Sequence, residues 1–251
     1  MRTLVVIPAR LAAVRLPHKP LRLLAGVPLI VRVWQRVAAM NVADVCVVAT
    51  DDESVARVVR AEGAECVMTG IGHASGTERV AEVAEMSQFA DFGTIVNVQG
   101  DEPFIGKSAI EGAASIVSSG RFPLGTSASP ADPTTADSPG VVKVVTADDG
   151  RALYFSRASI PFVRDADSPL PRADILQHIG VYAYSRDALA RWVALPQNAL
   201  ENTERLEQLR PLAAGIPIGV AVVRETPASG IDTEDDLSRA NARWQEFIAE
   251  R

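Results

Sequence analysis

Short runs of consecutive apolar residues alternate with helical patterns over the first hundred residues of the chain. The clearest runs are residues 3–8, 45–49 and 94–98, and each is apolar at nearly every position instead of every second one. Strands of this kind are typical of a sheet that helices cover on both faces. Strands separated by helices pair in parallel through right-handed crossovers. The pattern therefore predicts an α/β fold with a mostly parallel sheet.

Helix signals lie between these strands. Residues 28–40 place apolar side chains on one face behind an initial proline, and Thr50-Asp51-Asp52-Glu53 is typical of a helix N-terminus with acids in its first turn. The alternation weakens near residue 120. Because proline and serine accumulate in residues 123–139, we expect a loop there.

The second half of the chain is richer in strand patterns than in helical ones. Strands are expected at residues 141–145, 153–155, 179–184 and 218–223, and helices at residues 200–209 and 233–248. We therefore predict a β-rich extension of the parallel sheet within a single domain that spans residues 1–251.

Composition limits the partners of the chain. It has 251 residues, of which 47% are hydrophobic, and a formal net charge of -6. An acidic chain gains little from the field of a nucleic acid or an anionic membrane, so neither is expected as a partner. No apolar stretch is long enough to span a membrane. Cys46 and Cys66 lie in apolar runs and are expected to be reduced thiols, which favours a cytoplasmic protein.

Charged residues of opposite sign follow two of the predicted strands. Arg10, Arg15 and Lys19 follow the first strand, and Asp101 follows the strand at residues 94–98. Arginine and lysine bind phosphate oxygens, and a carboxylate suits the Mg²⁺ that a polyphosphate carries. Ligands of parallel sheets bind at the carboxyl ends of the strands, where the turn that contains Asp232 is also expected. The pattern predicts chemistry on a nucleoside triphosphate.

Two glycine-rich segments resemble known nucleotide motifs only partly. Residues 100–108 have one residue too many between their glycines for a P-loop, and they place two carboxylates where phosphates would lie. Residues 70–76 have Ser75 at the third small position of the dinucleotide fingerprint and follow a later strand instead of the first. We reject the P-loop and disfavour a dinucleotide-binding dehydrogenase.

Ten blocks in order along the chain resemble the cytidylyltransferases that activate 3-deoxy-D-manno-octulosonate (Kdo), the CMP-Kdo synthetases. The blocks are Ile7-Pro8-Ala9-Arg10, Arg15-Leu16-Pro17, Lys19-Pro20-Leu21, Ala49-Thr50-Asp51, Ser75-Gly76-Thr77-Glu78-Arg79, Val96-Asn97-Val98-Gln99-Gly100-Asp101-Glu102-Pro103, Tyr154-Phe155-Ser156-Arg157, His178-Ile179-Gly180-Val181-Tyr182, Leu206-Glu207-Gln208-Leu209-Arg210 and Ile231-Asp232-Thr233-Glu234-Asp235-Asp236-Leu237. The resemblance covers almost the whole chain. It implies a Rossmann-like nucleotidyltransferase fold, and CMP transfer from CTP to the anomeric hydroxyl of Kdo for lipopolysaccharide biosynthesis. It also implies Mg²⁺ and a homodimer.

The resemblance also implies roles for individual residues. Residues 1–120 would mainly bind nucleotide, through Arg10, Arg15, Lys19, His73, Ser75, Gly76, Arg79, Gln99 and Asp101. Lys19, Asp101 and Asp232 would be catalytic, and the two aspartates would hold Mg²⁺. Residues 121–251 would mainly bind the sugar acid and form the dimer, with Arg157, His178, Tyr182, Glu207 and Gln208 at the sugar. The carboxylate of the acid would pair with a guanidinium or an imidazole. The structural alternatives are helix caps at Ser75 or Thr77 and at Asp232-Thr233, and a turn at Gly100-Asp101.

The first loop departs from the family pattern, in which Ser-Thr precedes the second arginine and Gly precedes the lysine. Here these positions are Ala13, Val14 and His18, so two hydroxyl donors and a freely turning glycine are lost. A catalytically impaired relative that only binds nucleotide is therefore one alternative. Another is a cytidylyltransferase for a different sugar acid. The residues cannot separate 8-amino-Kdo from Kdo, because the two differ by one exocyclic group, whereas the Tyr154-Phe155-Ser156-Arg157 and Leu206-Glu207-Gln208-Leu209-Arg210 blocks argue against sialic acid.

Overall fold

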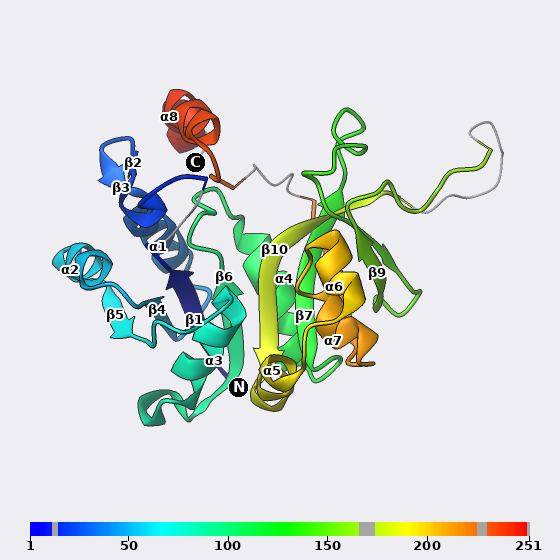
Figure 1. Ribbon diagram of the computed structural model, residues 1–251, viewed down its shortest axis with the longest axis horizontal. Helices are drawn as coiled ribbons and strands as arrows, with labels where there is room; N and C mark the ends of the chain where they lie inside the picture. The colour runs from blue at the N-terminus through cyan, green and yellow to red at the C-terminus, as the bar shows by residue number, and fades with distance from the viewer. Residues whose placement is uncertain (12–14, 166–173, 225–229, 250–251) are drawn as a thin grey trace. The chain divides into compact units, whose positions relative to one another are not determined.

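The computed structural model describes the chain except residues 12–14, 166–173, 225–229 and 250–251 (Figure 1). The chain divides into two compact units. The first unit comprises Met1–Lys107 and Ala228–Arg251, and the second comprises Ser108–Pro227. Asp232, in the half of the sequence expected to bind the sugar, thus belongs to the same unit as the N-terminal strands.

A parallel sheet forms the centre of the first unit. Its strands are β1 (Arg2–Ala9), β4 (Val45–Thr50), β5 (Glu65–Met68) and β6 (Phe92–Val98), in the order β6-β1-β4-β5. Leu4, Val5, Val6 and Ile7 of β1 are completely buried between its two neighbours. The strand order reverses between β1 and β6, and ligands of such sheets bind at the carboxyl ends on either side of this point.

Helices and short elements cover this sheet. They are the 3₁₀-helix η1 (Lys19–Leu21), the hairpin of β2 (Leu23–Leu24) and β3 (Val27–Pro28), α1 (Leu29–Met40), α2 (Glu53–Ala61), α3 (Gly76–Glu85), η2 (Ser87–Phe89) and α8 (Glu234–Ala249). Asp52 caps α2 by accepting hydrogen bonds from the backbone of Ser54 and Val55, as its position predicts. The predicted strand and helix positions of this unit are confirmed to within a few residues.

The C-terminal helix α8 is fixed to α1. The guanidinium carbons of Arg32 and Arg36 lie 4.8 and 4.6 Å from the ring centres of Trp244 and Phe247. The backbone N–H of Ala25 donates to Asn241 Oδ1 at 2.8 Å. Cation–π contacts of this kind stabilise a structure by about 0.5–1 kcal/mol each at exposed sites. The residues just before α8 are therefore held in one place.

The second unit contains α4 (Lys107–Ser118), β7 (Leu124–Pro130), β8 (Lys143–Thr146), β9 (Ala152–Ser156), β10 (Leu176–Ser185), α5 (Arg186–Ala194), α6 (Ala199–Glu204), α7 (Leu209–Ala213) and β11 (Ile218–Val222). Strand β11 pairs in parallel with β7, whereas β7–β10, β10–β8 and β8–β9 are antiparallel. The predicted α/β class and the β-rich extension are both confirmed.

Two predicted elements of the second unit are wrong. Residues 123–139 are not a continuous loop, because β7 occupies Leu124–Pro130 and is buried at all but its last residue. A side chain at Gly125 would lie 2.4 Å from the carbonyl oxygen of Ala113, so the small residues of this strand permit close contact with α4. The helix expected at residues 200–209 is interrupted at Arg205, which adopts a left-handed conformation at φ 55°.

Among the described residues, no helix combines the length and the apolar character that crossing a bilayer needs.

Candidate active site

A cavity of about 370 Å³ lies in the first unit, where β1 and β6 end. It is lined by Pro8, Ala9, Arg10, Arg15, Leu16, Lys19, Pro20, His73, Ser75, Gly76, Arg79, Gln99, Gly100, Asp101 and Asp232. All nine residues that were predicted to bind nucleotide are among them, together with the second predicted metal ligand, Asp232. The structure thus brings together residues that are up to 222 positions apart (10 to 232) around one cavity.

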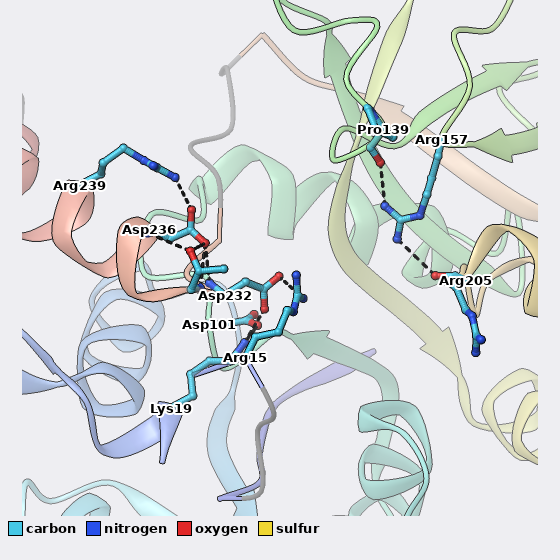
Figure 2. A network of polar contacts seen from close by, with 10 residues as sticks. Arg15, Lys19, Asp101, Pro139, Arg157, Arg205, Asp232, Asp236 and Arg239 are labelled. Carbon is cyan, nitrogen blue, oxygen red and sulfur yellow. Dashed lines mark hydrogen bonds and ion pairs between the residues drawn. The ribbon is translucent and has the colours of Figure 1, made fainter. Parts of the chain in front are cut away.

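Lys19 lies between the two aspartates of this cavity (Figure 2). Its Nζ donates to Asp101 Oδ2 and to Asp232 Oδ1, both at 2.7 Å. Arg15 donates to the other oxygen of Asp232 at 2.8 Å. Burial alone would lower the pKa of Lys19, but the charges of and hydrogen bonds to the two aspartates outweigh burial and raise it. Lys19 is therefore a permanent cation in this arrangement.

Backbone contacts place Asp232 beside Asp101. The N–H of Ile231 donates to the carbonyl of Asp101 at 2.9 Å. Gly230 lies close to the acidic turn, because a Cβ atom at this position would lie 2.7 Å from Glu102 Oε1 and the Glu102 side chain would have to shift. A bulkier residue would push the segment away from the acidic turn. The glycine before the Ile-Asp-Thr block is thus a site residue that we did not predict.

The helix cap expected at Asp232-Thr233 is present, but Thr233 and not Asp232 provides it. Thr233 caps α8, since its Oγ1 accepts from the backbone N–H of Asp236 at 3.2 Å. The carboxylate of Asp236 accepts in return from the N–H groups of Asp232 and Thr233 at 3.1 and 2.9 Å. The side chain of Asp232 is consequently left to face Lys19 and Arg15.

Glu102 adds a third carboxyl group next to Asp101, although it is not among the residues that line the cavity. Burial raises its pKa well above the usual range, and the negative charges of Asp101 and Asp232 raise it further. In the sequence, the position of Glu102 directly after Asp101 in the Gly-Asp-Glu-Pro turn could have indicated that it lies near the site. A buried carboxyl group whose pKa is raised thus lies beside the two assigned aspartates.

The start of α3 forms the opposite part of the lining. Ser75 caps this helix by accepting from the N–H of Glu78 at 3.2 Å, so the predicted cap and the predicted site position coincide. Arg79 is 3% exposed, and it donates to Asp51 at 3.0 Å and to Thr69. These bonds hold the preceding loop in place. Contact of Arg79 with nucleotide therefore stays a prediction beside this structural role.

The cationic loop shows one effect of its departure from the family pattern. His18 adopts the left-handed conformation, with φ 54° and ψ 31°, in which glycine has no steric penalty. The backbone thus keeps a turn that suits glycine although the side chain has changed. Ala13 and Val14 lie outside the described residues.

The donor groups of the cavity fit a divalent cation of the Mg²⁺ type. The described residues contain no group of three or more His, Cys, Asp and Glu side chains arranged for a metal. Asp101 and Asp232 both lie 2.7 Å from the ammonium of Lys19, so their carboxylates are close together. Mg²⁺ typically binds one or two carboxylates and takes its other ligands from phosphate oxygens and water. Asp101 and Asp232 could hold such an ion.

The residues predicted to bind the sugar acid lie in the second unit. His178 and Tyr182 on β10 are adjacent, with ring centres 5.3 Å apart, and the charge of Glu207 contributes to the raised pKa of Tyr182, after burial and the neighbouring Tyr184. Gln208 is buried at the start of α7. These placements leave the predicted sugar contacts as predictions.

Arg157 is engaged by backbone carbonyls (Figure 2). It donates to the carbonyl oxygens of Glu204, Pro139 and Arg205 at 2.8, 2.9 and 3.4 Å. A guanidinium has five N–H groups, so these three bonds leave two for a ligand. Arg157 is therefore held in one orientation and still able to bind a carboxylate.

The parallel sheet and the charged cavity at its carboxyl end define a nucleotidyltransferase-type α/β protein. The sequence profile of the cytidylyltransferases matches residues 4–218, and the chain belongs to this family. It is 57% identical over 245 residues to the 3-deoxy-manno-octulosonate cytidylyltransferase of Gemmatimonas aurantiaca, a match that covers 97% of this chain and 95% of that protein.

Solved structures agree with this relationship. The structure of CMP:2-keto-3-deoxy-manno-octonic acid synthetase complexed with CTP is 36% identical to this chain and superposes with a TM-score of 0.89, covering 98% of this chain and 99% of that one. The resemblance predicted from the ten sequence blocks is confirmed.

Proposed function

We propose that the protein transfers CMP from CTP to the anomeric hydroxyl of Kdo and releases pyrophosphate, a step of lipopolysaccharide biosynthesis. The observation that carries this proposal is the cavity in which Lys19 joins Asp101 and Asp232 beside Arg10 and Arg15. Its chemistry suits a metal-bound triphosphate. The relative with 57% identity bears the name of this activity.

The reaction needs few groups that exchange protons. The anomeric hydroxyl oxygen attacks the α-phosphorus of CTP and loses its proton to solvent, the bond from this phosphorus to the bridging oxygen breaks, and pyrophosphate leaves with the electron pair. Positioning and charge compensation provide most of the acceleration in such transfers. Arg10 and Arg15 would bind the oxygens of the leaving pyrophosphate.

Asp101 and Asp232 would hold Mg²⁺. When bound, the ion neutralises phosphate charge and aligns the α-phosphorus for attack. Lys19 now bonds to both aspartates, so it has to give up at least one of these contacts to reach a phosphate. The N-terminus of α3, capped by Ser75, would face the cytosine and ribose side of CTP.

Arg157, His178, Tyr182, Glu207 and Gln208 are proposed to bind the sugar acid. Two N–H groups of the Arg157 guanidinium form no hydrogen bond with the described part of the chain and could bind its carboxylate. We also retain the homodimer and the cytoplasmic location as predictions from the sequence.

Release of pyrophosphate tests the proposal directly. The protein is incubated with CTP, Mg²⁺ and one of three acids: Kdo, 8-amino-Kdo or sialic acid. We expect release with Kdo. Release with one of the other acids alone would reassign the acceptor, and calorimetric binding of CTP without release with any acid would identify an impaired relative.

Replacement of one metal ligand tests the roles within the site. Asp101→Asn keeps the shape of the side chain but removes its charge, so we expect kcat to fall by roughly 10²-fold or more. Near-normal turnover of this variant at saturating Mg²⁺ would contradict the role of Asp101.

A further inference from the structure

Strand β10 contains a bulge next to His178. In its pairing with β7, Ile179 lies opposite Ser127 and Tyr182 lies opposite Thr126, so two residues of β10 have no counterpart. Bulges disrupt the ladder locally and are frequent beside active sites. The carbonyl groups of the bulge need hydrogen-bond donors from elsewhere.

The hydroxyl of Thr126 is that donor. Thr126 is completely buried, and its Oγ1 lies 2.7 Å from the carbonyl oxygen of Val181 and 3.4 Å from that of Ile179. A carbonyl has no hydrogen, so the single hydroxyl hydrogen has to lie on the short contact to Val181. The oxygen of Thr126 therefore presents only lone pairs to its remaining neighbour.

That neighbour is Nε2 of His178, at 2.8 Å. Two atoms at this distance need one hydrogen between them, and Thr126 has already used its own. Nε2 must therefore carry a proton and donate it. Burial lowers the pKa of His178 to about 3, so the neutral ring has no second proton near pH 7. Nδ1 then carries only a lone pair.

Two further observations make Nδ1 the functional atom of this ring. The ring is confined, with the centres of Phe155 and Tyr182 at 5.1 and 5.3 Å. Among the described residues, none hydrogen-bonds to Nδ1. An open acceptor on a fixed ring can receive a hydrogen bond from a ligand, and its lone pair repels a carboxylate.

We propose that Thr126 is a positioning residue which holds His178 in the Nε2-protonated form, so that Nδ1 accepts a hydrogen bond from a hydroxyl group of the sugar acid. This rests on the proposed function for the identity of the ligand. It revises the role expected for the imidazole, since the carboxylate of the acid is left to Arg157. Thr126 discriminates hydroxyl from carboxylate without touching the substrate.

Nitrogen-15 NMR of the wild-type protein tests the protonation without any turnover. The chain has three histidines, and the His178→Gln variant identifies the signals of His178 by their loss. At pH 7 we expect a protonated Nε2 and a bare Nδ1. Kdo added with CTP and EDTA should shift the Nδ1 signal and leave Nε2 protonated. A protonated Nδ1, or a Nδ1 signal unchanged by Kdo that calorimetry shows to be bound, would overturn the proposal.

Variants of Thr126 test its effect on substrate binding. Thr126→Val removes the hydroxyl at similar volume, and we expect the KM for Kdo to rise roughly tenfold while the KM for CTP stays unchanged. Thr126→Ser should retain the wild-type protonation and KM. Ser127→Ala is the matched control, because the adjacent buried hydroxyl donates to Ala109 on α4 and not to His178.

The outcomes separate this inference from the proposed function. A Thr126→Val protein with unaltered protonation of His178, or with equal effects on both KM values, would refute the positioning role. If Thr126→Val does not fold, the wild-type spectrum and the Thr126→Ser variant still decide it. Absence of turnover with Kdo in the wild type would refute the function, whereas the protonation of His178 would remain measurable.

Discussion

Replacement of Lys19 by methionine measures how strongly the ligand-free site depends on its internal cation. The ammonium of Lys19 bonds to two carboxylates at 2.7 Å, and the pKa of the adjacent Glu102 shows that a third carboxyl group feels the same charges. Methionine keeps much of the apolar stem and removes the charge. Asp101 and Asp232 would then repel each other with only the exposed Arg15 left to compensate the charge of Asp232.

Exposure determines the expected size of this effect. The side chains of Lys19, Asp101 and Asp232 are 17%, 29% and 44% exposed. Fully exposed ion pairs contribute about 0.2–1 kcal/mol, and breaking a buried pair costs about 3–5 kcal/mol. The Lys19 cluster lies between these cases, so we expect a loss of about 2 kcal/mol. For a chain of this size that corresponds to a fall in Tm of roughly 4–8 °C.

Thermal unfolding with and without Mg²⁺ is the assay. Because a ligand of the native state stabilises it by mass action, Mg²⁺ should raise the Tm of Lys19→Met more than that of the wild type, in which the ammonium already occupies the aspartates. Arg15→Met is the control. Arg15 is 68% exposed and contacts only one of the aspartates, so its loss should cost less than about 1 kcal/mol. Equal stability of Lys19→Met and wild type, or no additional response to Mg²⁺, would refute the reasoning.

Three further predictions concern backbone and protonation. His18→Gly should raise Tm by roughly 2–4 °C in a thermal scan, because it removes left-handed strain of about 1 kcal/mol; a fall would show that the side chain of His18 stabilises the loop. Gly230→Ala should weaken CTP binding in calorimetry, since its Cβ would press on Glu102 and displace Asp232; unchanged affinity would contradict this placement. The low pKa of His178, about 3, means that the unfolded chain binds a proton first as the pH falls, so stability is complete above about pH 6.5 and declines below it. Urea unfolding should show the wild type losing about 1 kcal/mol more than His178→Gln between pH 6.5 and 5.5, and equal losses would show that His178 is not buried as a neutral ring.

Local patterns were sufficient to predict the parallel half of this protein. Continuous apolar runs specify strands buried on both faces, and Asp52 and Pro28 mark helix starts through interactions within a few residues of the chain. Strand β7 escaped prediction because its glycine, serines and alanine have weak strand propensity. The close approach of α4, which lies outside the strand itself, leaves no room for a side chain at Gly125.

Some features of the candidate site could likewise be predicted from the sequence, and others could not. The basic and acidic residues could be found from their types and their positions after strands, because the carboxyl ends of parallel strands always meet at one edge of the sheet. Only the tertiary structure determined that Thr233 and not Asp232 caps α8, that Gly230 lies against Glu102, and that Thr126 lies beside Nε2 of His178. Each of these features depends on contacts between atoms that become close only when the chain folds. The spacing of residues along the sequence does not predict such distances.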